Sequence, residues 1–405
     1  MTSLRKTILL LGGSAQQVVA VDTARRLGYD TVLCDYLPDN PGQYHADRFY
    51  QVSTTDKQAI LEIARKERID GIVAYASDPA APTAAYVAEE MGLPGNPAAA
   101  VETLCNKDRF RQFLIANGFH APVSGGYSDV EAAYADISRF SLPVIVKPVD
   151  SSGSKGVSVV NRMEDLRQAL EFAFSFSRGK RVIVEEFICK KHPYLIGGDV
   201  FVVDGKISLW GLLNCHRDER VNRLVPVGKS YPLLLERQDL ENVKKTLQEL
   251  VDQLQIRSGA MNVELVVDAQ DRVWPIDIGP RNGGNMIPEL LGYIFDVDIV
   301  ELTILAAMGE QVRLENRDGT PCYATHNLHA AKAGTFESIR FSPTLSQYIV
   351  RKSIYKRPGD PVEYFDNAAK ALGILFLKFP DEQTMFRIME DIHSHIHIQL
   401  AREQE

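Results

Sequence analysis

Two acidic residues on neighbouring predicted strands are the first candidates for chemistry. Residues 259–268 and 273–284 alternate polar and apolar side chains, which predicts two half-buried strands joined by a polar turn. If that turn holds an even number of residues, Glu264 lies directly opposite Asp277 on one face. Carboxylates about 5 Å apart repel each other, and a divalent cation between them would turn the repulsion into a binding site. Few oxygen ligands suit Mg²⁺ that also holds phosphate groups.

Arg281 lies four residues beyond Asp277, on the same face of the predicted strand, and could hold a second anion beside the metal. An acidic pair on a solvated sheet face is the alternative interpretation. A turn of odd length would also break the register. The rest of the chain favours the metal site.

A second motif could hold phosphate. The predicted strand 142–148 carries Lys147 near its end, and a loop of small residues leads to a second strand at 157–160. Small side chains let backbone N–H groups approach an anion closely. The order strand–loop–strand differs from a P-loop, whose loop opens a helix. An ordinary hairpin is the alternative. The loop residues are Ser151, Ser152, Gly153, Ser154, Lys155 and Gly156.

Two further stretches could contact a nucleotide or an anionic substrate. Residues 181–188 read as a buried strand that ends in two acids, where an adenine could use the backbone and a carboxylate could bind ribose hydroxyls. Residues 214–223 are too polar for a core strand and predict a loop. That loop either binds an anionic group or is merely solvated.

The first 100 residues predict the scaffold for these groups. Strands and helices alternate, which indicates a doubly wound α/β unit with a parallel sheet. A glycine turn at 12–14 followed by an acid after the second strand could indicate a dinucleotide site, but it is not GxGxxG. A tight turn on the substrate side is favoured, with Ser14, Gln16 and Asp78 as substrate contacts.

Composition narrows the function classes. The 405 residues suffice for two or three domains. A net charge of −8 argues against binding to nucleic acid or an anionic membrane, and no apolar run is long enough to span a bilayer. Five scattered cysteines without a CxxC pair fit reduced thiols in a cytoplasmic protein. The alternating histidines near the C-terminus favour a strand or a helix end over metal binding: His393, His395 and His397.

The order of these motifs resembles the ATP-grasp superfamily over roughly residues 1–310. Within it, the run Arg281–Pro288 is most similar to carboxylate–amine ligases of the L-amino-acid (dipeptide) ligase type. The resemblance implies an α/β protein with three parts: a doubly wound, Rossmann-like pre-ATP-grasp domain (1–104), an ATP-grasp region (105–310) and a small C-terminal α+β lobe (311–405). The ATP-grasp region would include a lid subdomain at about 119–186 and the catalytic hairpin 259–284.

The resemblance also implies roles for individual residues. Lys107 and Lys147 would bind the phosphates of ATP under the lid loop 151–156. Glu264 and Asp277 would bind one or two Mg²⁺ ions, with Mn²⁺ as an alternative. Arg281 would stabilise an acyl-phosphate and a tetrahedral intermediate. The adenosine contacts would be Glu185, Glu186, Phe187 and Ile188, and the substrate contacts would include His216, Arg217, Arg220, Gly283, Gly284 and Asn285.

One position departs from the superfamily pattern Glu-x-Asn-x-Arg. The chain has Asp277 for the acid and Gly279 for the asparagine. Loss of this asparagine is shared by the dipeptide-ligase type, but it removes one expected ligand of the second metal. In the predicted register Asn262 faces Gly279, and we expect it to replace the missing amide in part.

The implied activity is the ATP-dependent joining of a small acid, such as an amino acid, to an amine, with release of ADP and phosphate. Two alternatives remain: a purine-pathway carboxylase or formylating ligase, for which the Arg217–Arg223 cluster could bind a ribose phosphate, and an ATP-binding protein without turnover. The expected partners are small molecules, together with a second copy of the chain in a homodimer.

Overall fold

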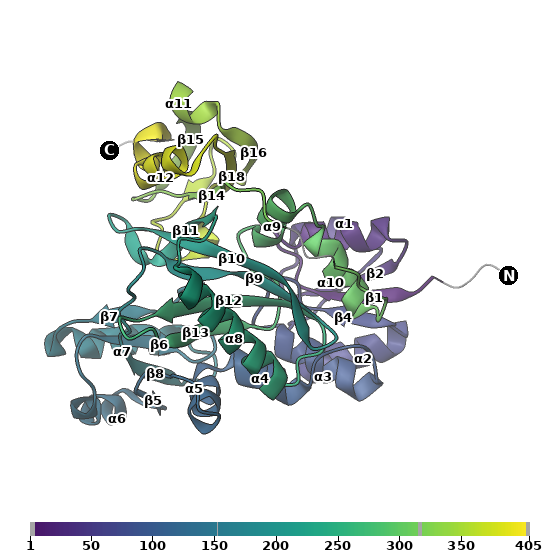
Figure 1. Ribbon diagram of the computed structural model, residues 1–405. Helices are drawn as coiled ribbons and strands as arrows, with labels where there is room; N and C mark the ends of the chain where they lie inside the picture. The colour runs from purple at the N-terminus through teal and green to yellow at the C-terminus, as the bar shows by residue number, and fades with distance from the viewer. Residues whose placement is uncertain (1–4, 152, 315–317, 402–405) are drawn as a thin grey trace.

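The first part of the chain forms a parallel sheet with helices on both faces (Figure 1). The computed structural model describes residues 5–151, 153–314 and 318–401, so Ser152 of the predicted loop lies outside the described residues. The strand order is β3-β2-β1-β4, and every pairing is parallel, which confirms the doubly wound unit. The strands are β1 (Thr7–Leu11), β2 (Asp30–Asp35), β3 (Arg48–Gln51) and β4 (Gly71–Val73).

Two helical layers bury the apolar strands of this sheet. One layer combines helix α1 with the distant helix α10, and the other combines α2 and α3. Each layer has its own core, because the strands are apolar on both faces, as expected for a parallel sheet. The bounds are α1 (Val18–Arg26), α2 (Lys57–Glu67), α3 (Ala81–Met91) and α10 (Ile299–Ala307).

A second sheet, also four-stranded and here called the small sheet, carries the predicted phosphate loop. Its order is β5-β8-β6-β7, all antiparallel, and helices α6 and α7 cover it. Helices α4 (Ala98–Cys105) and α5 (Lys107–Ala116) precede it. The other bounds are β5 (Ser124–Tyr127), α6 (Val130–Ala135), β6 (Val144–Pro148), β7 (Ser158–Val160), α7 (Leu166–Phe176) and β8 (Val182–Glu186).

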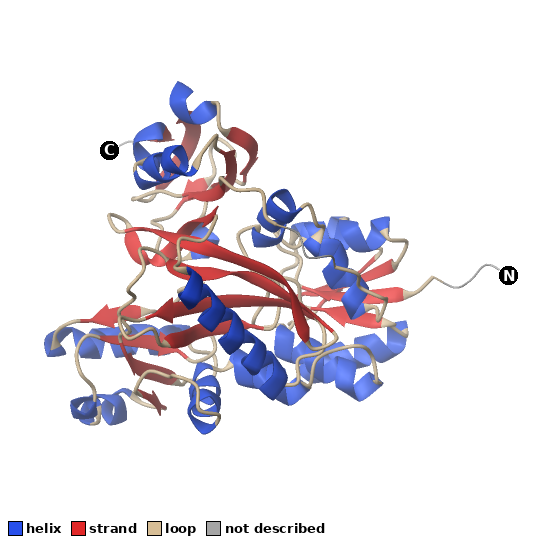
Figure 2. Cartoon of the chain, in the orientation of Figure 1, coloured by secondary structure: helices blue, strands red, loops and turns tan. Residues whose placement is uncertain are grey.

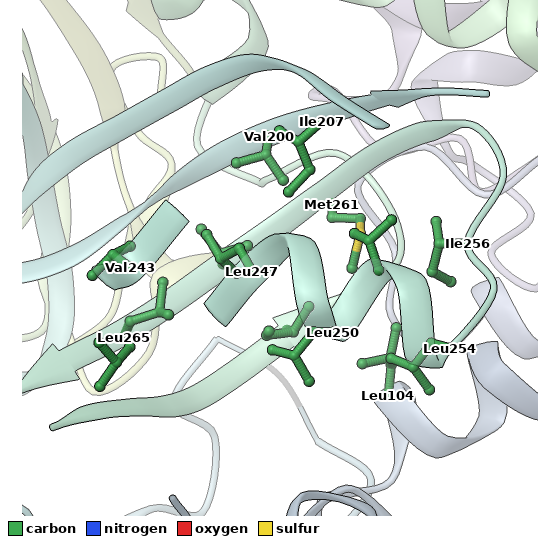
Figure 3. Packing of buried hydrophobic residues seen from close by; sticks show 14 of the residues in the cluster. Leu104, Val200, Ile207, Val243, Leu247, Leu250, Leu254, Ile256, Met261 and Leu265 are labelled. Atoms are coloured by element: carbon green, nitrogen blue, oxygen red, sulfur yellow. The ribbon is translucent and has the colours of Figure 1, made fainter. Parts of the chain in front are cut away.

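An eight-stranded sheet forms the centre of the molecule, in the order β13-β12-β9-β10-β11-β14-β18-β16 (Figure 2). Helix α8 (Arg237–Gln253) lies on it, and its leucines Leu247 and Leu250 pack against strand residues such as Met261 and Leu265 (Figure 3). The strands not yet given are β9 (Leu195–Val203), β10 (Lys206–Asp218), β11 (Asn222–Tyr231), β12 (Gly259–Val267), β13 (Val273–Gly279), β14 (Tyr323–Leu328), β16 (Ile349–Ile354) and β18 (Gly373–Lys378).

The prediction of a loop at 214–223 is wrong for most of that stretch. Strand β10 continues to Asp218, and strand β11 begins at Asn222. The polar side chains are tolerated in the sheet because they bond to each other: Asn214 Nδ2 donates to Ser230 Oγ at 3.1 Å, and His216 Nε2 lies 2.8 Å from the same oxygen. Only the short turn between the strands is a loop.

The C-terminal residues both extend the central sheet and add a small lobe. Strands β14, β18 and β16 complete the central sheet, and β17-β15-β19 form a three-stranded sheet beside α12 (Glu382–Glu390). The histidines 393–397 run from a short 3-10 turn into β19, and no group of three or more metal-ligating side chains occurs among the described residues. The remaining bounds are β15 (Gly334–Phe341), α11 (Pro343–Ser346), β17 (Pro361–Val362) and β19 (Ile396–Ala401).

Candidate active site

The β12–β13 hairpin brings the two predicted metal ligands face to face. Glu264 pairs with Asp277, and Asn262 pairs with Gly279, as predicted. The turn, however, has an odd number of residues, because Val267 pairs with Val273. A β-bulge after Glu264 leaves Ile276 without a partner and restores the register. The expected pairing is therefore confirmed, although it depends on the bulge.

The bulge has a partner of its own in Arg111 of helix α5. The Arg111 guanidinium donates to the carbonyl oxygens of Ile276 at 2.6 Å and Pro275 at 3.5 Å, and the residue is 1% exposed. Its Nε also donates to Glu185 Oε1 at 2.6 Å. Arg111 thus ties the distorted strand β13 to strand β8 of the small sheet.

Glu185 joins Arg111 to the predicted phosphate lysine. Lys147 Nζ lies 2.5 Å from Glu185 Oε2, and all three side chains are buried. Burial alone would raise the pKa of Glu185, but Arg111 and Lys147 lower it to about 2. Burial lowers the pKa of Lys147. Glu185, predicted as a nucleotide contact, therefore holds two cations in place.

Lys107 lies beside Asp277 of the carboxylate pair. Its Nζ donates to the carbonyl of Ser151 at 2.9 Å and lies 3.5 Å from Asp277 Oδ2. Burial alone would lower the pKa of Lys107, but Asp277 and Asp78 raise it overall, so the ammonium stays charged. A cavity of about 240 Å³ lies among Lys107, Asp277, Asp78 and the lid residue Ser151.

The lid loop contacts the large sheet in this structure. Ser154 Oγ donates to the carbonyl of Leu224 in β11 at 2.9 Å, and Ser151 Oγ donates to the carbonyl of Lys155 at 2.8 Å. Gly153 and Gly156 have positive φ values of 66° and 73°. The loop therefore presents small residues and turning backbone, as the predicted phosphate cradle requires.

The end of strand β8 is more open than its middle. Glu186 Oε1 accepts from the Ser141 N–H at 2.7 Å, and Phe187 is 41% exposed. Ile188 follows, half-buried and outside the strand. These three residues follow one another at the C-terminal end of β8, an inner strand of the small sheet, where a flat base could lie on the apolar side chains.

Arg281 is held by an acid from the first domain. Its Nε donates to Asp78 Oδ1 at 2.7 Å, and Nη2 contacts Asp78 Oδ2. Burial alone would lower the pKa of Arg281, but Asp78 raises it, so the guanidinium stays charged. A Cβ at Gly279 would lie 2.6 Å from Asp78 Oδ1 and 3.1 Å from Arg281 Cζ. Gly279 thus makes room for this ion pair where the superfamily pattern has asparagine.

The loop after Arg281 is fixed from two sides. Gly283 N donates to Asp199 Oδ2 at 2.8 Å, and Asn285 N donates to Gln16 Oε1 at 2.7 Å. Asn262 Nδ2 also donates to Asp199 Oδ1 at 2.9 Å, so its amide nitrogen supports the loop, and ligation of a metal by Asn262 stays a prediction. Burial raises the pKa of Asp199 to about 6, although its hydrogen bonds act in the opposite direction.

The predicted substrate residues of strand β10 separate into different places. Arg217 Nη2 lies 3.6 Å from Glu264 Oε1 and belongs to the site. His216 is 6% exposed, and burial lowers its pKa to about 3, so it is neutral and packed in the sheet. Arg220 Nε contacts Asp218 at 3.3 Å in the exposed turn. The structure thus brings only Arg217 to the carboxylate pair.

The glycine turn of the first domain is occupied by its own acid. Gly13 N donates to Asp35 Oδ2 at 2.7 Å, and Leu37 N donates to Asp35 Oδ1 at 2.9 Å. Asp35 therefore fixes the turn, which supports the favoured interpretation over a dinucleotide site. The turn leads to Gln16, the residue that reaches the Arg281 loop.

Sequence reasoning missed three groups of the site. Arg111 stands four residues after Lys107, so helical spacing alone could have placed both on one face. Asp199 lies in an otherwise apolar strand, and no pattern in the sequence marked it as part of the site. Lys229 of β11 is buried, and its Nζ contacts Cys215 Sγ at 2.5 Å beside Gly197, the residue opposite Glu264.

Comparisons with known proteins agree with this fold. The family model of the ATP-grasp domain matches residues 140–289 of the sequence. The family model of the ATP-grasp N-terminal domain matches residues 21–95. A crystal structure of an L-amino acid ligase from Bacillus licheniformis covers 99% of this chain and 100% of its own, with a TM-score of 0.82 and 20% identity. N5-carboxyaminoimidazole synthetase from Staphylococcus aureus, complexed with ADP, covers 97% and 98%, with a TM-score of 0.74 and 16% identity. The chain belongs to the ATP-grasp superfamily.

Two curated relatives refine the comparison. A formate-dependent phosphoribosylglycinamide formyltransferase of Synechococcus sp. (strain WH7803) is 35% identical over 193 residues, which are 46% of this chain and 49% of the relative. The chain thus spans about half the length of this relative. The uncharacterized protein y4rH of Sinorhizobium fredii is 25% identical over 96% of this chain and 81% of its own length.

Proposed function

We propose that the chain joins a carboxylate substrate to an amine at the expense of ATP, through an acyl-phosphate, and releases ADP and phosphate. The observation that carries this proposal is the register of the β12–β13 hairpin, which sets Glu264 opposite Asp277. Lys107 lies 3.5 Å from Asp277, and Arg217 lies 3.6 Å from Glu264. Two acids flanked by cations suit a metal-bound nucleotide phosphate.

The donor set fits Mg²⁺. Glu264 is 26% exposed and Asp277 is 43% exposed, so both can reach an ion, and their contacts to cations are long. A third protein ligand is not required, because Mg²⁺ retains waters and binds substrate phosphates. When bound, the ion would neutralise phosphate charge. We propose that the site holds one or two Mg²⁺ ions, with Mn²⁺ as an alternative.

The residues of the chain would act mainly through charge and position. Lys107, Lys147 and the lid amides would hold the phosphates of ATP while one oxygen of the substrate carboxylate attacks the γ-phosphorus. The bond to the β-phosphate oxygen breaks, which yields ADP and the acyl-phosphate. Glu186, Phe187 and Ile188 would contact the adenosine part.

Arg281 would serve the second half of the reaction. The amine attacks the acyl carbon, loses a proton, and expels phosphate. The guanidinium would stabilise the negative oxygens of the acyl-phosphate and of the tetrahedral intermediate. Water would hydrolyse the acyl-phosphate, so the lid loop must exclude it during turnover. The loop 283–285 would line the substrate side.

An amino acid is the acid we favour. Gly279 beside the Arg281–Asp78 pair matches the pattern of the dipeptide-ligase type, and the solved L-amino acid ligase shares the fold over the whole chain. A formylating ligase of the purine type is the second candidate, because one formyltransferase is 35% identical over 193 residues. Against it, Arg220 contacts Asp218 rather than joining Arg217 in one anion site.

Two features of the chain bear on where the reaction takes place. All five cysteines are free thiols, and no helix in the described ranges is long and apolar enough to cross a membrane. We therefore expect small-molecule partners and a cytoplasmic reaction, with ATP as co-substrate. The homodimer implied by the family resemblance stays a prediction.

The test is release of ADP and phosphate from ATP and Mg²⁺ with a matrix of acids and amines. The matrix includes all pairs of amino acids, formate, bicarbonate and phosphorylated ribonucleotides. Release that needs one acid and one amine, and is lost in Arg281→Ala and Glu264→Ala, supports the ligase. Release only with a phosphorylated ribonucleotide favours the second candidate. ATP binding without release under any condition contradicts both.

A further inference from the structure

A second cavity lies away from the metal pair, between the first domain and the edge of the central sheet. Its volume is about 440 Å³, within the range of small-molecule sites. One wall is helix α1, another is the first turn of helix α9 (Ile287–Phe295), and the third is the edge strand β16 with Tyr355 beyond it. Figure 1 shows α1 and α9 side by side at this place.

Two residues that line this cavity each carry a buried polar atom without a hydrogen-bond partner among the described residues. Glu289 Oε2 and Tyr355 Oη are both buried and unbonded. Such atoms cost free energy unless a partner satisfies them. Burial raises the pKa of Glu289, and it raises the pKa of Tyr355 to about 12. Within the described residues, nothing supplies the missing partners.

The cavity also contains a positively charged side chain. Arg351 lines the same cavity and forms no ion pair with any residue of the described ranges; its guanidinium instead lies over the ring of Phe376, 5.1 Å from the ring centre. By contrast, Arg26, another lining residue, is committed to Asp298 and Glu301, each at 2.8 Å. Asp22, which also lines the cavity, is bonded to His45 Nδ1 at 2.8 Å. Glu289 and Arg351 attract each other electrostatically but form no ion pair within 4 Å, so both can serve a ligand.

We propose that this cavity binds a free α-amino acid. On binding, the side chains of Glu289 and Tyr355 would turn their buried oxygens toward the ligand and accept hydrogen bonds from its ammonium group, and the ligand carboxylate would accept from Arg351. The side chain of the ligand would face the apolar part of the wall, which includes Val18, Val19 and Met286. A simple amine would leave Arg351 without an anion, and a simple acid would leave Glu289 without a donor.

The cavity is connected to the candidate active site. Gln16 and Met286 both line it, and Gln16 Oε1 accepts from Asn285 N at 2.7 Å, at the end of the loop that begins with Arg281. A ligand in the cavity would therefore contact Gln16 and Met286, the residue after Asn285, next to one of the two hydrogen bonds that fix this loop. Occupancy would set the position of the loop without touching the metal pair. The site goes beyond the proposed ligase reaction, and its occupancy can be measured without turnover.

The test is calorimetric titration of the nucleotide-free full chain with each of the common amino acids, and with the matching amine and acid that lack one of the two charged groups. We expect at least one amino acid to bind and its two truncated analogues not to bind. Glu289→Gln and Arg351→Ala should each weaken binding about tenfold or more. Lys352→Ala, an exposed neighbour on the same strand that does not line the cavity, should leave the affinity unchanged.

Two outcomes would overturn the proposal. One is the absence of binding by every amino acid. The other is binding that survives Arg351→Ala but is lost in Arg281→Ala, since that would place the amino acid in the substrate site instead. Thermal melting of each variant checks folding, and Arg351 lies exposed at a sheet edge, where alanine is well tolerated. Because no ATP is present, failure of the ligase reaction would not affect this result.

Discussion

Arg281 of the central hairpin forms a bidentate ion pair with Asp78 of the first domain. The Nε–Oδ1 distance is 2.7 Å, and the two side chains are 13% and 22% exposed. The pair joins two parts of the chain that are 203 residues apart in sequence. It therefore fixes the guanidinium beside the carboxylates before any substrate arrives.

Replacing Asp78 should damage both stability and turnover. Asp78→Ala leaves a mostly buried guanidinium without its anion, which costs on the order of 3 kcal/mol. We expect a lower urea midpoint and at least a tenfold fall in kcat for ADP release. Asp78→Asn retains a hydrogen-bond acceptor, so its urea midpoint and kcat should lie between those of wild type and Asp78→Ala. Wild-type kcat in Asp78→Ala would show that Arg281 needs no such anchor.

Restoring the asparagine of the superfamily pattern should not improve metal binding. In Gly279→Asn the new Cβ would lie 2.6 Å from Asp78 Oδ1, so Asp78 and Arg281 must move apart. We expect turnover to fall. The double variant Asp78→Gly/Gly279→Asn removes the clash, so the two changes should be strongly non-additive in a double-mutant cycle. Simple additivity of the two effects would contradict the steric explanation.

The sequence predicted the elements of this site better than the contacts between them. Period-two alternation with an assumed even turn placed Glu264 opposite Asp277, and the pairing holds only because a bulge offsets the odd turn. The strand–helix alternation was enough for the first domain. The ion pair between Arg281 and Asp78 could not be predicted, because it depends on how the first domain docks on the hairpin. The bulge at Ile276 was equally invisible, since nothing in the local pattern marks it.

Loss of either hairpin carboxylate should raise the Mg²⁺ requirement. Removing one of two charged ligands in Glu264→Gln or Asp277→Asn should shift the Mg²⁺ midpoint for ADP release at least about tenfold higher. Glu219→Gln changes one charge in the exposed β10–β11 turn and is the matched control. An unchanged Mg²⁺ midpoint in both hairpin variants would show that Glu264 and Asp277 do not bind the metal.

The buried Glu185 should make stability depend on acid pH. Its pKa is about 2 in the folded state against an ordinary value of 4.5, so the folded state binds this proton more weakly than the unfolded state. The resulting stabilisation is complete above pH 4.5 and disappears as pH falls toward 2. Glu185→Gln should therefore be much less stable than wild type at pH 7, and the gap should narrow in acid.

Urea unfolding of both proteins at a series of pH values measures this gap. Glu186→Gln, at the more open end of the same strand, is the matched control and should cost little at any pH. A gap for Glu185→Gln that stays constant from pH 7 to acid would contradict the ionised triad of Arg111, Glu185 and Lys147.

The error at residues 214–223 has a physical cause. The polar residues of this stretch were taken as evidence against a strand. Within the sheet, however, Asn214 and His216 both hydrogen-bond to the hydroxyl of Ser230. Which polar groups find partners depends on how strands pair, and Asn214 and His216 meet Ser230 across the β10–β11 pair, 16 and 14 residues away in sequence. The same dependence hid Asp199, whose partners Gly283 and Asn262 come from later strands and loops.

The most direct measurement of the central claim is trapping of the acyl-phosphate. The protein is incubated with ATP, Mg²⁺, hydroxylamine and each candidate acid in turn, and hydroxamate and ADP are quantified together. The account predicts equal amounts of hydroxamate and ADP with at least one amino acid, and neither product in Glu264→Ala. ADP formed without hydroxamate from any carboxylic acid would contradict an acyl-phosphate mechanism, and so would hydroxamate formation that persists in Glu264→Ala.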